Sequence, residues 1–312
     1  MHKDNHTMVI EFILLGFHDL HNFQILLFLF LIVMYAATIA GNVLIIVLVT
    51  TFHQFHIPMY IFLCHLSLAD ILISTNVAPK ALQVILLGRS STPAGDCITQ
   101  LYFFGVSAII ECCLLTVMSY DRYLAICKPL HYTTIMNIIL PHILALWCWV
   151  AGFVFAGIPQ FLISELDFCG PNEIDHFFCD LAPVLELSCS DTSRVQIEVS
   201  IVVIVMCLLQ FFYVIATYVC IFSSILQISS ITGRHKAFST CSSHLTVVCI
   251  YYGTLIVLYV SPSRGYSLNF NKALSFLNTA VTPLFNPIIY SLRNKDIRET
   301  IQNVISHKIT PM

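Results

Sequence analysis

Seven stretches of this chain each run for about 20 residues or more with almost no charged side chains. A helix rises 1.5 Å per residue, so each stretch is long enough to cross the ~30 Å hydrocarbon core of a bilayer. Only helices and closed barrels satisfy every backbone hydrogen bond in lipid. We therefore predict an all-α membrane protein, a seven-transmembrane helix bundle with spans at about 24–50, 57–79, 98–120, 138–163, 195–228, 237–260 and 273–292.

Composition excludes the main alternative classes. Only 10% of the residues are charged, whereas a soluble domain carries roughly 25%. The sequence has no nucleophile elbow, phosphate loop or exposed pair of acids, so we do not expect an enzyme. We also expect no metal, because no His/Cys cluster has metal-ligand spacing, and neither a cofactor nor a nucleic-acid partner.

The basic residues orient the bundle. Lys and Arg favour the cytoplasmic side of a membrane. With the N-terminus outside, the inner segments carry a net charge of +5 and the outer segments −6. We therefore predict an extracellular N-terminal segment, 1–23, and a cytoplasmic tail, 293–312. The run 293–298 predicts a short amphipathic helix along the inner surface after the seventh span.

The outer segments hold features typical of an oxidising compartment. Asn5 begins an Asn-His-Thr glycosylation sequon, which is usable only if the N-terminus is outside. Four of the thirteen cysteines lie in outer segments: Cys97, Cys169, Cys179 and Cys189. They predict two disulfides, with three possible pairings. Three of them fall in the long outer loop, 164–194, which suggests a stapled lid or rim.

The third span ends at a charge pair, Asp121-Arg122. Arg122 follows Cys97 by 25 residues, or about 38 Å of helix, so the two lie at opposite mouths of the membrane. Local composition alone favours an interfacial anchor for the pair. The alternative is a switch, because an ion pair at the rim can open without entering lipid.

Two acids, Asp70 and Glu111, lie near mid-membrane. Each costs about 2.5–3.5 kcal/mol on insertion unless it is neutralised or paired. They predict a buried polar site, either an ion or water cluster held between them or two protonated acids with hydrogen-bonded neighbours.

The sixth and seventh spans carry further polar residues. We interpret His244 as a hydrogen-bonded packing residue rather than a pH sensor or metal ligand. Pro283 and Pro287 predict a kink near the inner rim, where Asn286 could bind the freed backbone groups or Asp70.

Several motifs together resemble those of the olfactory receptors, within the rhodopsin-like G protein-coupled receptors, over nearly the whole chain. The most specific are Met118-Ser119-Tyr120-Asp121-Arg122-Tyr123 and Lys236-Ala237-Phe238-Ser239-Thr240-Cys241-Ser242-Ser243-His244. Others are the stretches 12–17, 41–42, 58–60, 66–70 and 283–295. The stretch 168–171 is similar to the tetrapod-type class. The departures are mild: His56-Ile57 before Pro58, Ser119 for the commoner alanine, and Tyr251 where phenylalanine is usual.

The resemblance implies roles for individual residues. It pairs Cys97 with Cys179 and Cys169 with Cys189. By the same resemblance, Asp121, Arg122 and Tyr123 form an ionic latch. The arginine meets Tyr218 and Tyr290 on activation. Asn286 and Pro287 are part of the hinge. The resemblance also implies a ligand pocket in the outer half of the bundle lined by Phe104, Gly105, Ala108, Ile109, Val202, Val203, Met206, Tyr252, Leu255, Ile256, Tyr259, Phe276 and Thr279.

The implied function is that of a multi-pass plasma-membrane receptor. We expect it to bind small, volatile, mainly apolar odorants and to activate a heterotrimeric G protein of the stimulatory olfactory type, which raises cyclic AMP. The alternatives are a chemoreceptor of the same fold that acts outside the nose and a membrane transporter, since seven spans with buried acids occur in transporters too.

Overall fold

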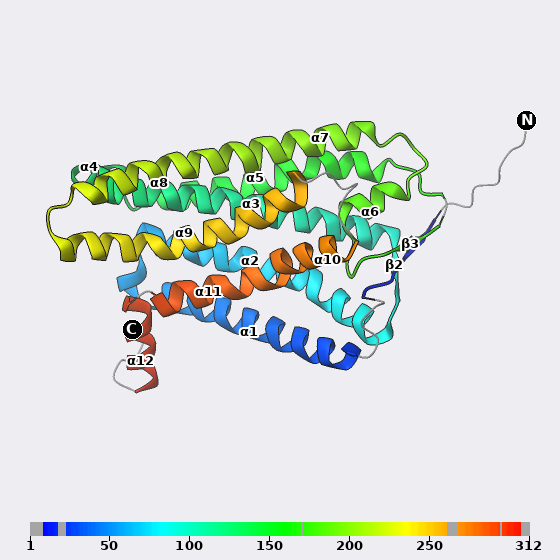
Figure 1. Cartoon of the computed structure of the whole chain (residues 1–312), viewed down its shortest axis with the longest axis horizontal. Helices are drawn as coiled ribbons and strands as arrows, with labels where there is room; N and C mark the ends of the chain where they lie inside the picture. The colour runs from blue at the N-terminus through cyan, green and yellow to red at the C-terminus, as the bar shows by residue number, and fades with distance from the viewer. Residues whose placement is uncertain (1–8, 18–22, 170, 261–267, 294, 307–312) are drawn as a thin grey trace, which may run out of the picture.

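The structure, a computed structural model, describes residues 9–17, 23–169, 171–260, 268–293 and 295–306. Seven long helical segments lie side by side along the long axis of the molecule (Figure 1). They are α1 (Gln24–Thr51), α2 (Pro58–Leu87), α3 (Ala94–Cys127), α5 (Leu140–Ser164), the continuous run of α7 (Ser193–Val203), η3 (Ile204–Leu208) and α8 (Leu209–Gln227), α9 (Ile231–Val260), and the run of α10 (Leu268–Phe276), η4 (Leu277–Val281) and α11 (Thr282–Arg293).

The helices extend beyond the predicted membrane spans. α3 continues to Cys127, so Asp121 and Arg122 lie within the helix rather than at its end. A helix that leaves the bilayer keeps its own backbone hydrogen bonds, so a charged residue at the rim does not have to stop it. α2 likewise continues to Leu87, where Gly88 ends it in the left-handed conformation, with φ of 74°.

Short elements gather at the two ends of the bundle. We call the end that holds a small β-sheet and both disulfides the outer end, and the opposite end the inner end. The inner end carries η2 (His53–Phe55), α4 (Pro129–Ile135) and α12 (Lys295–Ile305). α12 turns across the end of α11 (Figure 1), and its Ile297 is buried, in keeping with the predicted amphipathic helix.

The three-stranded sheet at the outer end was not predicted. β1 (Glu11–Leu14) pairs antiparallel with β2 (Ser90–Pro93) and parallel with β3 (Glu173–Ile174). Successive strand residues point to opposite faces, which buries Phe12 and Leu14 completely on one face. The N-terminal segment is thereby fastened to two outer loops that lie far from it in the sequence.

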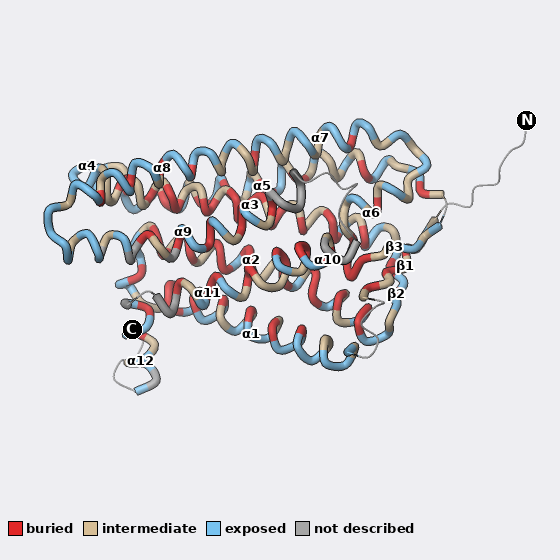
Figure 2. Tube along the Cα trace, viewed as in Figure 1, coloured by how far each residue is buried: buried red, intermediate tan, exposed pale blue. Residues whose placement is uncertain are grey.

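Burial follows the pattern of a bundle in lipid. Buried positions face the neighbouring helices and exposed positions face outward (Figure 2). Many exposed positions carry large apolar side chains, such as Phe212, which is 63% exposed. In the described residues, α1, α2, α3, α5 and the run Ser193–Gln227 are each long and apolar enough to cross a membrane. An apolar outer surface of this extent fits a bilayer rather than water.

Pro287 of α11 explains one contact between the first and seventh helical segments. Pro287 has no N–H, so it leaves the carbonyl of Pro283 without its helical donor. Asn42 of α1 replaces that donor, with its Nδ2 atom 3.0 Å from the Pro283 oxygen. Gly41 allows this approach, since a Cβ atom there would lie 3.1 Å from Cγ of Pro287.

Candidate ligand cavity and charged switch

An apolar cavity lies in the outer half of the bundle, between α3, α5, α7, η3, α9 and the loop helix α6 (Leu181–Glu186). Its volume is about 110 Å³. A dry cavity of about 150 Å³ holds a benzene molecule, so this one suits a ligand of only a few heavy atoms without rearrangement. It is lined by Leu101, Tyr102, Phe104, Gly105, Ala108, Ile109, Ala156, Pro159, Gln160, Ile163, Asp180, Leu181, Val199, Val202, Val203, Met206, Cys207 and Leu255.

Small residues set the distance between α3 and α5 at this cavity. At Gly152 the two helices are in close contact, because an added Cβ atom would lie 2.6 Å from Cγ1 of Ile110. Further toward the outer end, a Cβ atom added to Gly105 would lie 3.5 Å from that of Ala156, an ordinary contact distance. The glycine at 105 therefore leaves space on the cavity side that a larger residue would fill.

Eight of the residues implied by the resemblance line this cavity, namely Phe104, Gly105, Ala108, Ile109, Val202, Val203, Met206 and Leu255. Phe276 and Thr279 instead line a second cavity of about 20 Å³, between α1, α2 and η4. That volume is about one water-sized sphere. The side chains of Ile256 and Tyr259 lie outside the described residues.

Tyr252 does not line the cavity in this structure. Its ring is buried and packs 5.2 Å from the ring of Phe211, and its hydroxyl donates to the Cys112 carbonyl at 3.4 Å. The rotation of α9 against α3 decides this, and sequence position alone does not reveal that rotation.

Three polar residues of the cavity wall were not anticipated: Tyr102, Gln160 and Asp180. Gln160 donates to the Ile98 carbonyl at 3.0 Å and Tyr102 to the Phe153 carbonyl at 3.3 Å, so both connect α3 with α5. Asp180 caps α6, where its Oδ1 atom accepts the N–H of Leu181 at 2.7 Å. An Asp immediately before a helix is a readable capping signal, but its place beside a cavity is not.

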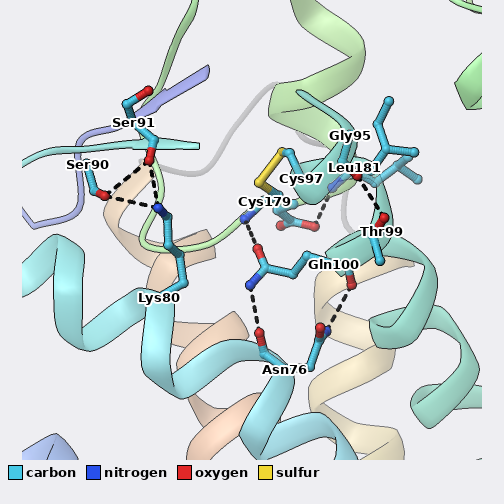
Figure 3. The surroundings of a disulfide bond; sticks show 12 residues. Asn76, Lys80, Ser90, Ser91, Gly95, Cys97, Thr99, Gln100, Cys179 and Leu181 are labelled. Atoms are coloured by element: carbon cyan, nitrogen blue, oxygen red, sulfur yellow. Dashed lines mark hydrogen bonds between the residues drawn. A yellow bond between two sulfur atoms is a disulfide. The ribbon is translucent and has the colours of Figure 1, made fainter. Parts of the chain in front are cut away.

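The roof of the cavity is held by the disulfide between Cys97 and Cys179, shown in Figure 3. Gln100, one turn further along α3, accepts the backbone N–H of Cys179 at 2.9 Å. Gln100 and Asn76 of α2 also exchange side-chain to backbone hydrogen bonds of 2.8 and 2.9 Å. This network joins α2, α3 and the long outer loop above the cavity.

The second disulfide, between Cys169 and Cys189, closes the long outer loop on itself. The backbone N–H of Cys189 donates to the Asp167 carbonyl at 2.9 Å, which places the two halves of the loop side by side. Both pairings are those that the resemblance implies.

A buried lysine ties three outer segments together. Lys272 of α10 is 2% exposed, and its Nζ atom lies 2.6 Å from Oδ1 of Asp175 and 2.8 Å from the carbonyl oxygen of Gly16. The N-terminal segment, the long outer loop and the seventh helical segment therefore meet at one ammonium group. We call Lys272 and Asp175 the outer ion pair.

His176 follows the outer ion pair along the loop and is almost completely buried. Its ring stacks on Phe177, and neither ring nitrogen has a hydrogen-bond partner among the described residues. Burial lowers the pKa of His176, and the charge of Lys272 lowers it further against the opposing effect of Asp180 and Asp175. The imidazole is therefore neutral at neutral pH.

At the inner end, Arg122 binds its own neighbour. Its Nε atom donates to Oδ2 of Asp121 at 2.9 Å, and its Nη2 atom contacts the same oxygen. The hydroxyl of Tyr132, in α4, donates to the other carboxylate oxygen at 2.8 Å. Burial and the Asp121 charge raise the pKa of Tyr132, so it stays protonated as a donor. We call Asp121 and Arg122 the inner ion pair.

The two tyrosines implied as partners of Arg122 are placed differently. The Tyr218 hydroxyl is 2.6 Å from Nδ1 of His244, and Nε2 of His244 is 3.1 Å from the Leu115 carbonyl oxygen. A carbonyl can only accept, so Nε2 carries a hydrogen, and in the neutral ring the Tyr218 hydroxyl donates to Nδ1. His244 is thus a hydrogen-bonded packing residue. Tyr290 is buried, and its hydroxyl has no partner among the described residues.

The other polar residues predicted from the sequence lie in the bundle core and toward its inner end. Asn286 donates to both carboxylate oxygens of Asp70, at 2.9 and 3.0 Å. Glu111 is buried, with Oε1 unpartnered among the described residues. The two acids stay a predicted buried polar or ion site. Tyr123 lies under the Lys128 ammonium, 5.9 Å from its ring centre.

Metal binding and glycosylation receive no structural support from this arrangement. Among the described residues, no three His, Cys, Asp or Glu side chains come together as a metal site. Asn5 lies outside the described part of the chain.

Comparison with known proteins places the whole chain in one group. The sequence profile of a family described as olfactory receptor matches residues 31–308. Olfactory receptor 6F1 of Homo sapiens is 49% identical over 302 residues, which cover 96% of this chain and 98% of that protein. Olfactory receptor 11L1 of Homo sapiens is 44% identical, with 99% and 96% covered. Olfactory receptor 5P55 of Mus musculus is also 44% identical, with 98% of each chain covered.

Proposed function

Because this chain belongs to the olfactory receptor family, whose members are multi-pass plasma-membrane receptors and not enzymes, we propose that it binds small, mainly apolar odorants in the cavity between α3, α5 and η3. The observation that carries the proposal is the cavity itself, which lies under the disulfide-bound roof and has an almost wholly apolar wall. Ligand pockets are typically apolar, with a few polar groups that orient the ligand. Here Tyr102, Gln160 and Asp180 are those groups.

The ligand acts by favouring one of two states of the bundle. It can shift that balance only by its difference in affinity for the two states. The cavity wall is formed by α3, α5, α7, η3 and α9, so a ligand that fits it better in the active state changes how these helices pack. At their inner ends, α3 and α9 carry Arg122 and His244. We propose that the ligand-favoured state releases Arg122 from Asp121 and opens the inner end to a heterotrimeric G protein.

The coupling partner proposed here is the stimulatory olfactory type, which raises cyclic AMP. The test is a screen of a chemically diverse odorant panel in transfected cells with a cyclic AMP reporter. We expect responses to be confined to compounds of a few heavy atoms, since the cavity is about 110 Å³. Accumulation of a compound inside vesicles without any G protein would support the transporter alternative instead.

A substitution at Gly105 tests whether this cavity is the binding site. Gly105→Ala adds one methyl group into the cavity at ordinary contact distance from Ala156, so the fold should tolerate it. Overpacking costs about 1–3 kcal/mol, which corresponds to about a 5- to 150-fold loss of potency for the largest active odorant. The smallest active odorant should lose much less.

Gly157→Ala is the matched control, because a Cβ atom there meets nothing within 4 Å and Gly157 does not line the cavity. Potency should be unchanged in that variant. Equal losses for large and small odorants in Gly105→Ala, or equal losses in both variants, would place the binding site elsewhere.

A further inference from the structure

One cysteine lines the cavity, and its thiol is in contact with the thiol of a second, buried cysteine. Cys207, in the π-helical turn η3, lines the cavity. Its sulfur lies 3.6 Å from that of Cys112 of α3, which is completely buried. The proposed odorant function does not use either thiol.

The hydrogen bonds behind Cys207 have one consistent direction. Tyr251 donates its only hydroxyl hydrogen to the Ala108 carbonyl at 2.7 Å. The Cys112 thiol, 3.6 Å from the Tyr251 oxygen, must then be the donor in that contact. Cys112 has no second hydrogen, so Cys207 donates to it. In the described part of the chain, no hydrogen-bond donor occupies the lone pairs of the Cys207 sulfur.

Tyr251 is one of the departures of this chain from the olfactory receptor pattern, which usually has phenylalanine there. A phenylalanine has no hydroxyl to accept from Cys112. The order of donors from Cys207 through Cys112 to Tyr251 is therefore a property of this particular chain rather than one that the motif predicts.

We propose that Cys207 is a covalent attachment site for small soft electrophiles, with α,β-unsaturated aldehydes as the chemical class. The sulfur forms a bond to the β carbon of the aldehyde, and the π electron pair of its carbon–carbon double bond moves to the α carbon. The S–H bond breaks, and its proton ends on the α carbon. Atoms and electrons balance without an oxidant or a further reactant. This inference rests on the proposed function, since it uses the same cavity.

Size and proximity both favour the reaction. Acrolein has four heavy atoms and is smaller than benzene, which fills a cavity of about 150 Å³. A thiolate is the reactive form of cysteine, and apolar surroundings disfavour it. Binding offsets this, because holding two reactants in contact can give an effective molarity of about 10⁵ M or more. Cys112 lacks this advantage, since it is completely buried and does not line the cavity.

The experiment treats purified full-length receptor in lipid nanodiscs with acrolein and follows each cysteine-containing peptide by mass spectrometry over time. We expect the acrolein adduct to form on Cys207 while Cys112 stays unmodified. An excess of propanal, which has the same size but no carbon–carbon double bond, should slow the labelling of Cys207. It should not slow the labelling of Cys220, which is exposed on α8 outside the cavity.

Cys207→Ser should lose the adduct on its peptide and keep the labelling of Cys220. In cells, acrolein should then give a response that persists after washout in the wild type and decays in Cys207→Ser, whereas the propanal response should decay in both. Labelling of Cys207 no faster than Cys112, or labelling that propanal does not slow, overturns the inference.

The labelling requires no G protein, so the two proposals fail separately. A receptor that responds to odorants but leaves Cys207 unmodified keeps the proposed function and loses this site. A receptor that is modified at Cys207 but gives no cyclic AMP response to any odorant keeps the site and loses the proposed function.

Discussion

The outer and inner ion pairs differ in what they connect. The outer pair joins Lys272 and Asp175, which are 97 residues apart, and the same ammonium binds the Gly16 carbonyl, 256 residues away. The inner pair joins Asp121 to Arg122, its neighbour on the same helix. The outer pair therefore holds separate segments together, whereas the inner pair by itself holds no two helices together.

This difference assigns the two pairs different tasks. Breaking the outer pair releases an N-terminal segment, a loop and a helix from one another, which is a loss of stability. Opening the inner pair changes only what Arg122 is bound to, and its partner Tyr132 comes from α4. We expect the outer pair to control stability and the inner pair to control signalling.

The largest expected effect is on signalling. Arg122→Ala removes the group that the proposed active state presents at the inner end, so the odorant-evoked cyclic AMP response should be lost at equal surface expression. The variant also leaves the fully buried Asp121 carboxylate without its arginine, which lowers the thermal unfolding midpoint, so the response has to be compared at equal surface expression. A normal cyclic AMP response in this variant would show that the inner pair is only an anchor.

The next effect is on stability. Asp175→Ala leaves the Lys272 ammonium buried without its carboxylate, which costs about 3–5 kcal/mol. Lys272→Met should cost less, about 1 kcal/mol, since the remaining Asp175 side chain is 39% exposed and can be solvated. The measurement is the thermal unfolding midpoint of the purified receptor.

The double variant Asp175→Ala/Lys272→Met provides the control, because it removes the stranded charge. It should unfold at a higher temperature than Asp175→Ala alone. A double variant no more stable than Asp175→Ala would mean that the outer pair is not the source of the stability.

A smaller effect is expected from Tyr132, which donates a hydrogen bond to Asp121 of the inner ion pair. Tyr132→Phe removes the hydrogen bond to Asp121 and weakens the hold of that carboxylate on Arg122. A loss of about 1 kcal/mol shifts an equilibrium about fivefold, so basal cyclic AMP signalling should rise by up to that factor. Tyr213→Phe, on the exposed face of α8, is the control and should leave basal signalling unchanged. A fall in basal signalling in Tyr132→Phe would contradict the role of the inner ion pair in restraining Arg122.

The smallest effect concerns the pH dependence of the outer end. The folded-state pKa of His176 is below its ordinary value of about 6.5. The unfolded chain therefore binds a proton more readily, so the stabilising contribution is complete above about pH 6.5 and declines as the pH falls below it. Asp175, Asp180 and Lys272 are the charged groups that face the ring.

His176→Phe should reduce the drop in unfolding midpoint between about pH 7.5 and pH 5.5. His142→Gln, at an exposed position on α5, should leave the drop unchanged. If His176→Phe shows the full wild-type drop, the acid sensitivity of the outer end has another origin.

Several features of the structure could be predicted from local sequence. A charge-poor stretch is helical in lipid whatever its neighbours are, so the helical segments follow from composition alone. The interpretation of His244 as a packing residue also agrees with its hydrogen bonds to Tyr218 and Leu115. Asn286 binds Asp70, one of its two expected partners. The other expected partner, the Pro283 carbonyl that lacks its helical donor because of Pro287, accepts a hydrogen bond from Asn42 instead.

Other features could not be predicted because they depend on how distant segments meet. β1 is a run of four residues, and only its pairing with two outer loops makes it a strand. The α5 wall of the cavity depends on how closely that helix packs against α3, and Gly152 allows a close contact between the two. Phe276 and Thr279 fall beside a different, smaller cavity, since the rotation of α10 and η4 turns them toward α1 and α2.

The sequence by itself determined the fold class, the number of helical segments and the outer cysteines that could pair. Those properties are local, since the length and polarity of each segment by themselves decide whether it can form a helix across the lipid. The tertiary structure decided where the cavity lies, which residues reach it and that Cys207 lines it in contact with Cys112. These depend on the rotation and approach of helices, which a few contacts between distant residues set.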